Sequence, residues 1–183
     1  VPRPEASPLP LAFQPTARSP EYVFTGPGPL RLVDAKTGSV LAVVEVPGDL
    51  RHALLIVAEV ASRAPESRRC EVNVVDDSAL RYGPGQLLIL NLSGLSLSGL
   101  INRHHTILVA GVNGPFRADR SAVLNLRTPF RGRTYQAFAD TLVLEQGDRA
   151  LLLLLPPYQR GSLEVQSRIL LDAPPLEGRQ RSR

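Results

Sequence analysis

Short apolar runs separated by turn residues recur along the whole chain, and no segment has the convincing spacing of an amphipathic helix. Residues 87–90, Leu-Leu-Ile-Leu, follow the turn Gly83-Pro84-Gly85 and end at the polar Asn91. A run of strand length without alternation, bounded by turn residues, is typical of a strand that is buried on both faces. We therefore predict that residues 87–90 form a central strand around which the other strands pack.

Further strands are predicted at intervals of roughly 8–14 residues, which gives about ten to twelve strands in all. They are residues 30–33, 40–46, 52–60, 70–75, 95–101, 106–110, 123–126, 134–144, 150–155 and 163–171. Residues 52–60 also fit a helix, but their length and the loop-like sequence after them favour a strand. Residues 111–115, which contain two Gly and one Pro, are interpreted as a connection. The pattern predicts an all-β antiparallel sandwich, either jelly-roll-like or immunoglobulin-like.

Composition separates two chain ends from the predicted domain. Residues 1–18 are rich in proline and predict an extended segment, residues 19–176 the β-sandwich domain, and residues 177–183 a basic tail. A chain of 183 residues with 43% hydrophobic residues suits one domain, or at most two small ones. Residues 95–103 are a candidate break between two half-domains, although no linker is visible there.

The sequence also suggests where the protein acts. It contains no Met and begins with Val1, so we expect that a signal peptide has been removed, although a cloning boundary would look the same. The longest apolar run, residues 150–155, is much shorter than the roughly 18 residues of a membrane helix, so we expect no membrane span. The expectation from these features is an exported protein.

The positive charge of the chain is concentrated at its ends. The formal net charge is +4, from 21 Lys and Arg residues against 17 Asp and Glu residues. The two ends hold five of the basic and two of the acidic residues, so 16 basic and 15 acidic residues remain between them. The densest basic run in the predicted domain is residues 127–133, where Phe130 could stack on a base. We interpret this run as a solvated loop and disfavour nucleic acid as the partner.

The titratable residues show no arrangement typical of a metal site. His104 and His105 are adjacent, so a regular strand would direct them to opposite faces, and no third ligand lies nearby. We interpret both as solvated turn residues and expect neither a metal nor a cofactor. Cys70 alternates with polar neighbours and is interpreted as a small buried hydrophobic residue. Asn91 fits an N-glycosylation motif with Ser93, but the apolar strand around it favours a buried position.

No catalytic residue is predicted from the sequence. Asp76 and Asp77 lie where a strand ends, and we interpret them as side chains that cap a turn. The alternative is a small hydrolase with a loop-built site, which would require Asp76, Asp77 and His105 to converge in one cleft. Six charged or titratable residues remain as candidate ligand contacts: Arg127, Arg131, Arg133, Asp76, Asp77 and His105.

An ordered set of motifs carries a resemblance to known proteins. The motifs are Ser-Pro-Glu-Tyr at residues 19–22, Phe-Thr-Gly-Pro-Gly-Pro-Leu at 24–30, Val-Val-Glu-Val-Pro at 43–47, Leu-Leu-Ile-Val at 54–57, Val-Asp-Asp-Ser at 75–78, Tyr-Gly-Pro-Gly at 82–85, Asn-Leu-Ser at 91–93 and Arg-Ile-Leu-Leu-Asp at 168–172. In this order they resemble a family of uncharacterised exported bacterial proteins with a signal peptide and a single all-β domain. The resemblance implies export and a sandwich fold, but no activity and no catalytic residue. We expect a binding or structural module of the bacterial periplasm or cell envelope, without catalysis. The sequence identifies no partner, and another envelope protein is one candidate.

Overall fold

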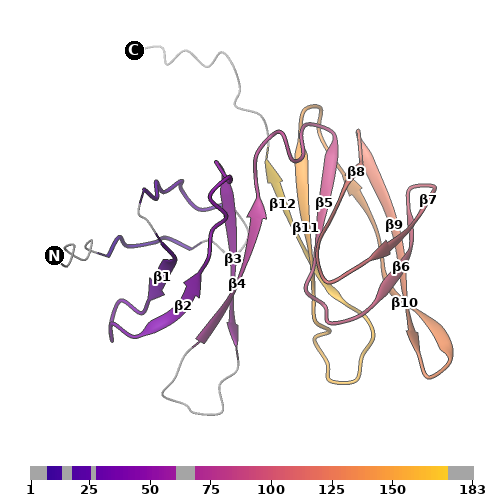
Figure 1. Ribbon diagram of the computed structural model, residues 1–183. Coiled ribbons are helices and arrows are strands. Elements are labelled where there is room, and N and C mark those ends of the chain that lie inside the picture. The colour runs from indigo at the N-terminus through magenta and orange to yellow at the C-terminus, as the bar shows by residue number, and fades with distance from the viewer. Residues whose placement is uncertain (1–7, 14–17, 26–27, 61–68, 173–183) are drawn as a thin grey trace, which may run out of the picture. The chain divides into compact units, whose positions relative to one another are not determined.

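The computed structural model describes residues 8–13, 18–25, 28–60 and 69–172, and within these ranges it contains twelve strands and no helix (Figure 1). The strands are β1 (Leu30–Val33), β2 (Val40–Val44), β3 (Ala53–Val60), β4 (Arg69–Asp76), β5 (Gln86–Asn91), β6 (Leu97–Ile101), β7 (His104–Leu108), β8 (Gly111–Arg117), β9 (Ser121–Phe130), β10 (Arg133–Val143), β11 (Arg149–Leu155) and β12 (Gln166–Asp172). All of the strands predicted from periodicity are present, including β3, for which a helix was the alternative.

The chain divides into two compact units, residues 1–77 and residues 78–183. The sequence predicted one sandwich domain over residues 19–176, whereas the sandwich described below is built from β5–β12 of the second unit. The boundary falls between Asp77 and Ser78, two polar residues that do not stand out in the sequence as a linker. The candidate break at residues 95–103 lies inside the second unit.

The first unit contains two antiparallel hairpins, β1–β2 and β3–β4. Its described part buries few large apolar side chains: Leu32, Val44 and Val75 are each 7% exposed or less. Two-stranded ribbons need a packed face to be stable, because their own hydrogen bonds barely offset the entropy of ordering the chain. These three residues lie on β1, β2 and β4, so each hairpin contributes to the buried part of this unit.

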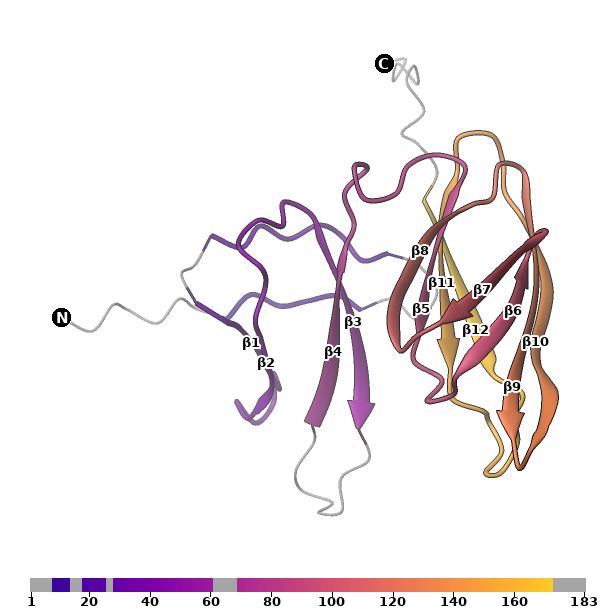
Figure 2. The ribbon, with the colours of Figure 1, turned by 45° about the vertical axis from the view of Figure 1, so that its right-hand side comes forward.

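The second unit is a sandwich of two four-stranded sheets, ordered β10-β9-β6-β7 and β12-β11-β5-β8 (Figure 2). All pairs are antiparallel except β5 and β11, which run parallel. The expected all-β antiparallel sandwich is therefore confirmed, with this one parallel pair. β5 lies between β11 and β8, so it is an inner strand, as predicted for residues 87–90.

The core of the sandwich is filled by side chains from both sheets. The cluster includes Leu87 and Ile89 of β5, Leu124 and Leu126 of β9, and Leu152 of β11. Alternation directs Leu88 and Leu90 to the opposite face of β5, where they are also buried, at 0% and 1% exposed. The prediction that this strand is buried on both faces is confirmed.

Gly85 sets the start of β5, as the turn sequence predicted. Its φ of 71° lies in the left-handed region, which glycine adopts without steric cost. In this conformation its N–H donates to the carbonyl of Asp148 at 2.8 Å, and its carbonyl accepts from the N–H groups of Ala118 and Asp119. The turn thereby connects β5 to the chain segments on both sides of it.

Two sequence predictions about connections are wrong. Residues 111–115 form most of β8, because an edge strand tolerates glycine and proline that a central strand would not. The predicted loop at residues 127–133 is the end of β9 and the start of β10, and only Arg131 and Gly132 form the turn between them. Both of these turn residues have positive φ, 48° and 74°, as a tight hairpin turn requires.

Candidate functional site

The candidate site lies on the outer face of the sheet β10-β9-β6-β7, the face turned away from the core. Alternation along β9 buries Leu124 and Leu126 in the core and places Asn125 and Arg127 on the outer face. Strand register then sets Ser98 of β6 beside Arg127, and Ile107 of β7 beside Ser98. Residues from three different strands therefore form one row across the sheet.

A shallow, open hollow of about 710 Å³ lies on this sheet. It is lined by Ser98 of β6, His105, Thr106 and Ile107 of β7, Arg127 of β9 and Thr134 of β10. Arg127 and His105 are both exposed, and both were among the six candidate contacts from sequence. The fold therefore brings together two candidates that are 22 positions apart in the chain.

Gly99 of β6 also lines the hollow, and it allows β6 and β9 to approach each other closely beneath the hollow. A Cβ at this position would overlap the carbonyl oxygen of Asn125 and would lie 3.0 Å from the Cα of Leu126. Both neighbours are backbone atoms of β9, so they cannot rotate away as a flexible side chain would. Only glycine lets β6 and β9 come this close.

The chemistry of the hollow suits an anion next to an apolar group. The Arg127 guanidinium can donate two parallel hydrogen bonds to a carboxylate or a phosphate. Ser98 and Thr134 add hydroxyl groups, and the Ile107 side chain is 76% exposed beside them. No Asp or Glu lines the hollow, so nothing in it competes for the guanidinium.

The wider outer face of this sheet has the same character. Register and alternation place on it the residues Ser98, Leu100, His105, Ile107, Val123, Asn125, Arg127, Pro129, Thr134, Gln136, Ala139 and Thr141. None of these residues is acidic, and the ionisable ones are Arg127 and His105. A ligand on this face therefore meets a basic, hydroxyl-rich and partly apolar surface.

The other two candidate arginines lie at the turn between β9 and β10 and do not line the hollow. The Arg131 guanidinium lies over the Phe130 ring, 5.1 Å from its centroid. Phe130 and Tyr135 meet edge to face, with ring centroids 6.5 Å apart. These contacts engage the two aromatic residues beside the turn and the Arg131 side chain.

Asp76 and Asp77 belong to the first unit, whereas His105 belongs to the second. The carboxylate of Asp77 forms an ion pair with the guanidinium of Arg18, and its backbone N–H donates to the carbonyl of His52 at 2.9 Å. The ion pair joins segments that are far apart in sequence. Neither aspartate lines the hollow.

The two adjacent histidines begin β7, where the sequence predicted a turn. His104 pairs with Ile101, whose side chain is buried, and His105 pairs with Leu100, so they are directed to opposite faces. Within the described ranges, no group of three or more His, Cys, Asp or Glu side chains could hold a metal ion. Neither histidine therefore belongs to a multidentate site in the described part of the chain.

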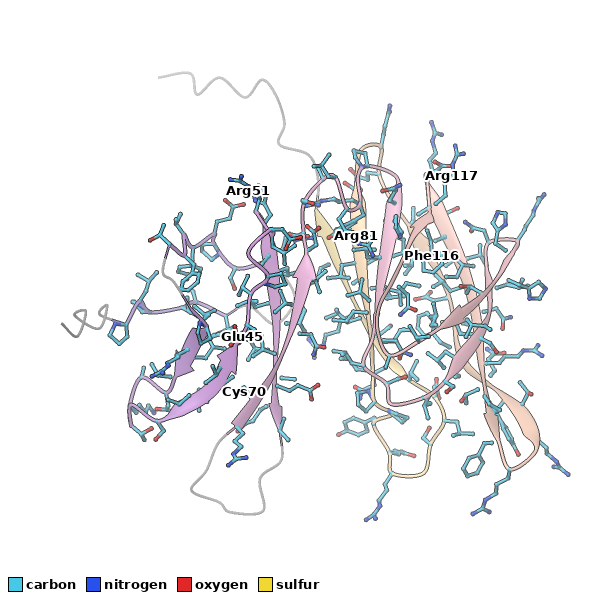
Figure 3. All side chains as sticks on the ribbon, in the orientation of Figure 1. Glu45, Arg51, Cys70, Arg81, Phe116 and Arg117 are labelled. Carbon is cyan, nitrogen blue, oxygen red and sulfur yellow. The ribbon has the colours of Figure 1, made fainter. Side chains whose placement is uncertain are left out.

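Two further residues singled out in the sequence have structural positions. Cys70, labelled in Figure 3, is a free thiol on β4 and is half-buried, so it is less enclosed than predicted. Asn91 is 2% exposed, which confirms its predicted burial. Its Oδ1 accepts a 2.6 Å hydrogen bond from the Ser93 hydroxyl, and its Nδ2 donates to the Leu95 carbonyl at 3.2 Å.

Sequence reasoning missed Ser98, Thr106, Ile107 and Thr134 as site residues. The alternation of Leu with Ser and Gly before residue 101 did indicate that Ser98 is exposed, but it gave no neighbour for it. In the part of the chain that the structure describes, no helix is long and apolar enough to cross a membrane. No family model matches this sequence, and no curated protein or solved structure matches it either.

Proposed function

We propose that this protein is a non-catalytic binding module of the bacterial envelope, and that it binds an anionic ligand on the outer face of the sheet β10-β9-β6-β7. The observation that carries the proposal is the hollow in which Arg127 and His105 lie together without any carboxylate. An exposed guanidinium without an acidic partner in its hollow is available to an external carboxylate or phosphate. Export is supported by the motifs shared with the exported family.

Binding is favoured over catalysis because the hollow is open to solvent. A hydrolase activates its nucleophile by a neighbouring base and excludes water from the reaction. In the described part of the chain, His105 has no hydrogen bond to the hydroxyls of Ser98, Thr106 or Thr134. The hydrolase alternative therefore has no nucleophile and base in contact to support it.

The proposal is tested by titrating the ¹⁵N-labelled protein with short poly-L-glutamate and following backbone amide shifts by NMR. We expect the largest shifts at Ser98, His105 and Arg127, and no comparable shifts with poly-L-lysine. Arg127→Ser should weaken binding about tenfold, because a charge-assisted hydrogen bond contributes about 1.5–3 kcal/mol and exposed ones lie at the low end. Arg131→Ser is the matched control, since it removes the same charge from the hairpin turn outside the hollow.

Two outcomes would contradict this proposal. If the shifts gather at Arg131 and Arg133, the basic turn and not the hollow is the binding surface. If Arg127→Ser and Arg131→Ser weaken binding equally, the attraction is a general charge effect that salt would screen. Export is tested separately by fractionating the producing bacterium, where recovery with cytoplasmic markers would contradict an envelope location.

A further inference from the structure

The hollow adjoins a strand whose outer side has no partner. β7 (His104–Leu108) is the last strand in the order β10-β9-β6-β7, and within the described ranges it pairs only with β6. Outside that pairing, its five residues make no further backbone hydrogen bond with the described part of the chain. The N–H and C=O groups along its outer side are therefore available to another extended chain.

The four edge strands of the sandwich differ in how they resist such pairing. β10 carries a bulge between Gln136 and Phe138, and β8 contains Gly114, Pro115 and a register shift against β5. β12 contains charged residues, whereas β7 has no Pro, Gly, Lys or carboxylate and pairs in regular register. Proteins protect edges with bulges, prolines and charges, and β7 lacks all three of these devices.

The side chains beside this edge define what an added strand would meet. His105 and Ile107 lie on the outer face of β7, two residues apart, and His105 shares the hollow with Arg127. Residues two apart on an added strand lie directly beside these two positions. The position beside His105 therefore favours a carboxylate, and the position beside Ile107 favours an apolar side chain.

We propose that the ligand is an extended acidic segment of a partner protein, which adds to β7 as an antiparallel fifth strand of the sheet. This inference rests on the proposed function, because the carboxylate of the added strand would lie beside His105, which lines the hollow. Antiparallel addition sets the order of residues in the segment: the apolar residue beside Ile107 comes first, and Asp or Glu beside His105 comes two positions later. The main chain supplies affinity and the two side chains supply specificity.

Charge favours such a partner over a second copy of this chain. Arg103 is exposed just before β7, and His105 of β7 is exposed as well. Pairing two copies through this edge would bring two basic surfaces together, whereas an acidic segment neutralises one. Self-association is therefore treated as an outcome that would overturn the proposal.

The test measures fluorescence anisotropy of the full chain with a fluorescein-labelled probe peptide, Gly-Thr-Val-Thr-Glu-Thr-Gly. Two further peptides carry backbone N-methyl groups. The first is methylated at Val and Glu, and the second at the Thr between them and at the Thr that follows Glu. Only alternate N–H groups of an added strand point toward β7, so one methylated peptide should lose at least tenfold in affinity. The other should stay within about threefold of the parent peptide.

Matched variants of the protein test the contact between His105 and the carboxylate of the peptide. His105→Ser should weaken binding several-fold, while His104→Ser, which changes the neighbouring residue on the opposite face, should leave it unchanged. Replacing Glu by Lys in the peptide should abolish detectable binding. Equal effects of the two histidine variants would overturn the assignment of the carboxylate to His105.

The outcomes separate this inference from the proposed function. If poly-L-glutamate binds in the hollow but both methylated peptides bind like the parent, strand addition is wrong and the anion site remains. If neither poly-L-glutamate nor the parent peptide binds, both proposals fail. A concentration-dependent dimer in sedimentation, with slowed hydrogen exchange in β7, would assign this edge to a second copy and overturn the acidic partner.

Discussion

Truncation of the central strand tests the sandwich core most directly. Ile89 of β5 is 0% exposed and belongs to the core cluster between the two sheets. Ile89→Ala removes three carbon groups, each worth about 0.8 kcal/mol of transfer free energy, or about 2.4 kcal/mol together. The cavity that remains adds to this, because core substitutions of this kind cost about 2–5 kcal/mol in total. We therefore expect the free energy of unfolding to fall by about 3–4 kcal/mol.

The same substitution at an exposed isoleucine provides the control. Ile107 of β7 is 76% exposed, so Ile107→Ala should change the free energy of unfolding by less than about 0.5 kcal/mol. Leu88→Ala should fall in the larger class with Ile89→Ala, since Leu88 is 0% exposed on the other face of β5. Lys at either buried position should be worse, because it would bury an unpaired charge.

Urea unfolding followed by far-ultraviolet circular dichroism measures these differences. With a urea dependence of about 1–3 kcal/mol per molar, a loss of 3–4 kcal/mol moves the midpoint by roughly 1–4 M. The reasoning is refuted if Ile89→Ala and Ile107→Ala shift the midpoint equally. If Leu88 tolerates Lys without loss, β5 has a solvated face and is not the strand that the chain packs around.

Three further substitutions have expected outcomes in the same unfolding assay. Gly99→Ala should cost about 1–3 kcal/mol or more, because the added methyl group overlaps rigid backbone of β9, and an unchanged midpoint would mean that the strands separate freely. Arg18→Ser should lower the free energy of unfolding by about 1–3 kcal/mol, because it removes the partner of Asp77, whose side chain is 16% exposed. Arg103→Ser is the control at an exposed arginine and should leave the free energy of unfolding unchanged. Asn113→Ala should lower the free energy of unfolding by about 2 kcal/mol, because the Asn113 side chain makes hydrogen bonds to three backbone groups at the corner between β7 and β8. Proteolysis of this variant should begin at that corner.

The sequence by itself determined the strands and the class of fold. Alternation of apolar and polar residues with a period of two is a local pattern, so the sequence reveals it wherever one face of a strand is buried. The continuous run at residues 87–90 likewise identified an inner strand, because only burial on both faces removes alternation. β8 was not predicted as a strand, because Gly114 and Pro115 are typical of turns. A strand tolerates them here because β8 lies at the edge of its sheet.

The candidate site was decided by the tertiary structure. Arg127 and His105 were visible as candidates, but their meeting depends on β6 lying between β7 and β9, with Ser98 beside Arg127. The parallel pairing of β5 with β11 and the division of the chain after Asp77 were likewise decided by the tertiary structure and were not predicted from the sequence. Such pairings join segments far apart in the chain, and they are selected by how buried faces fit together, which local alternation does not encode.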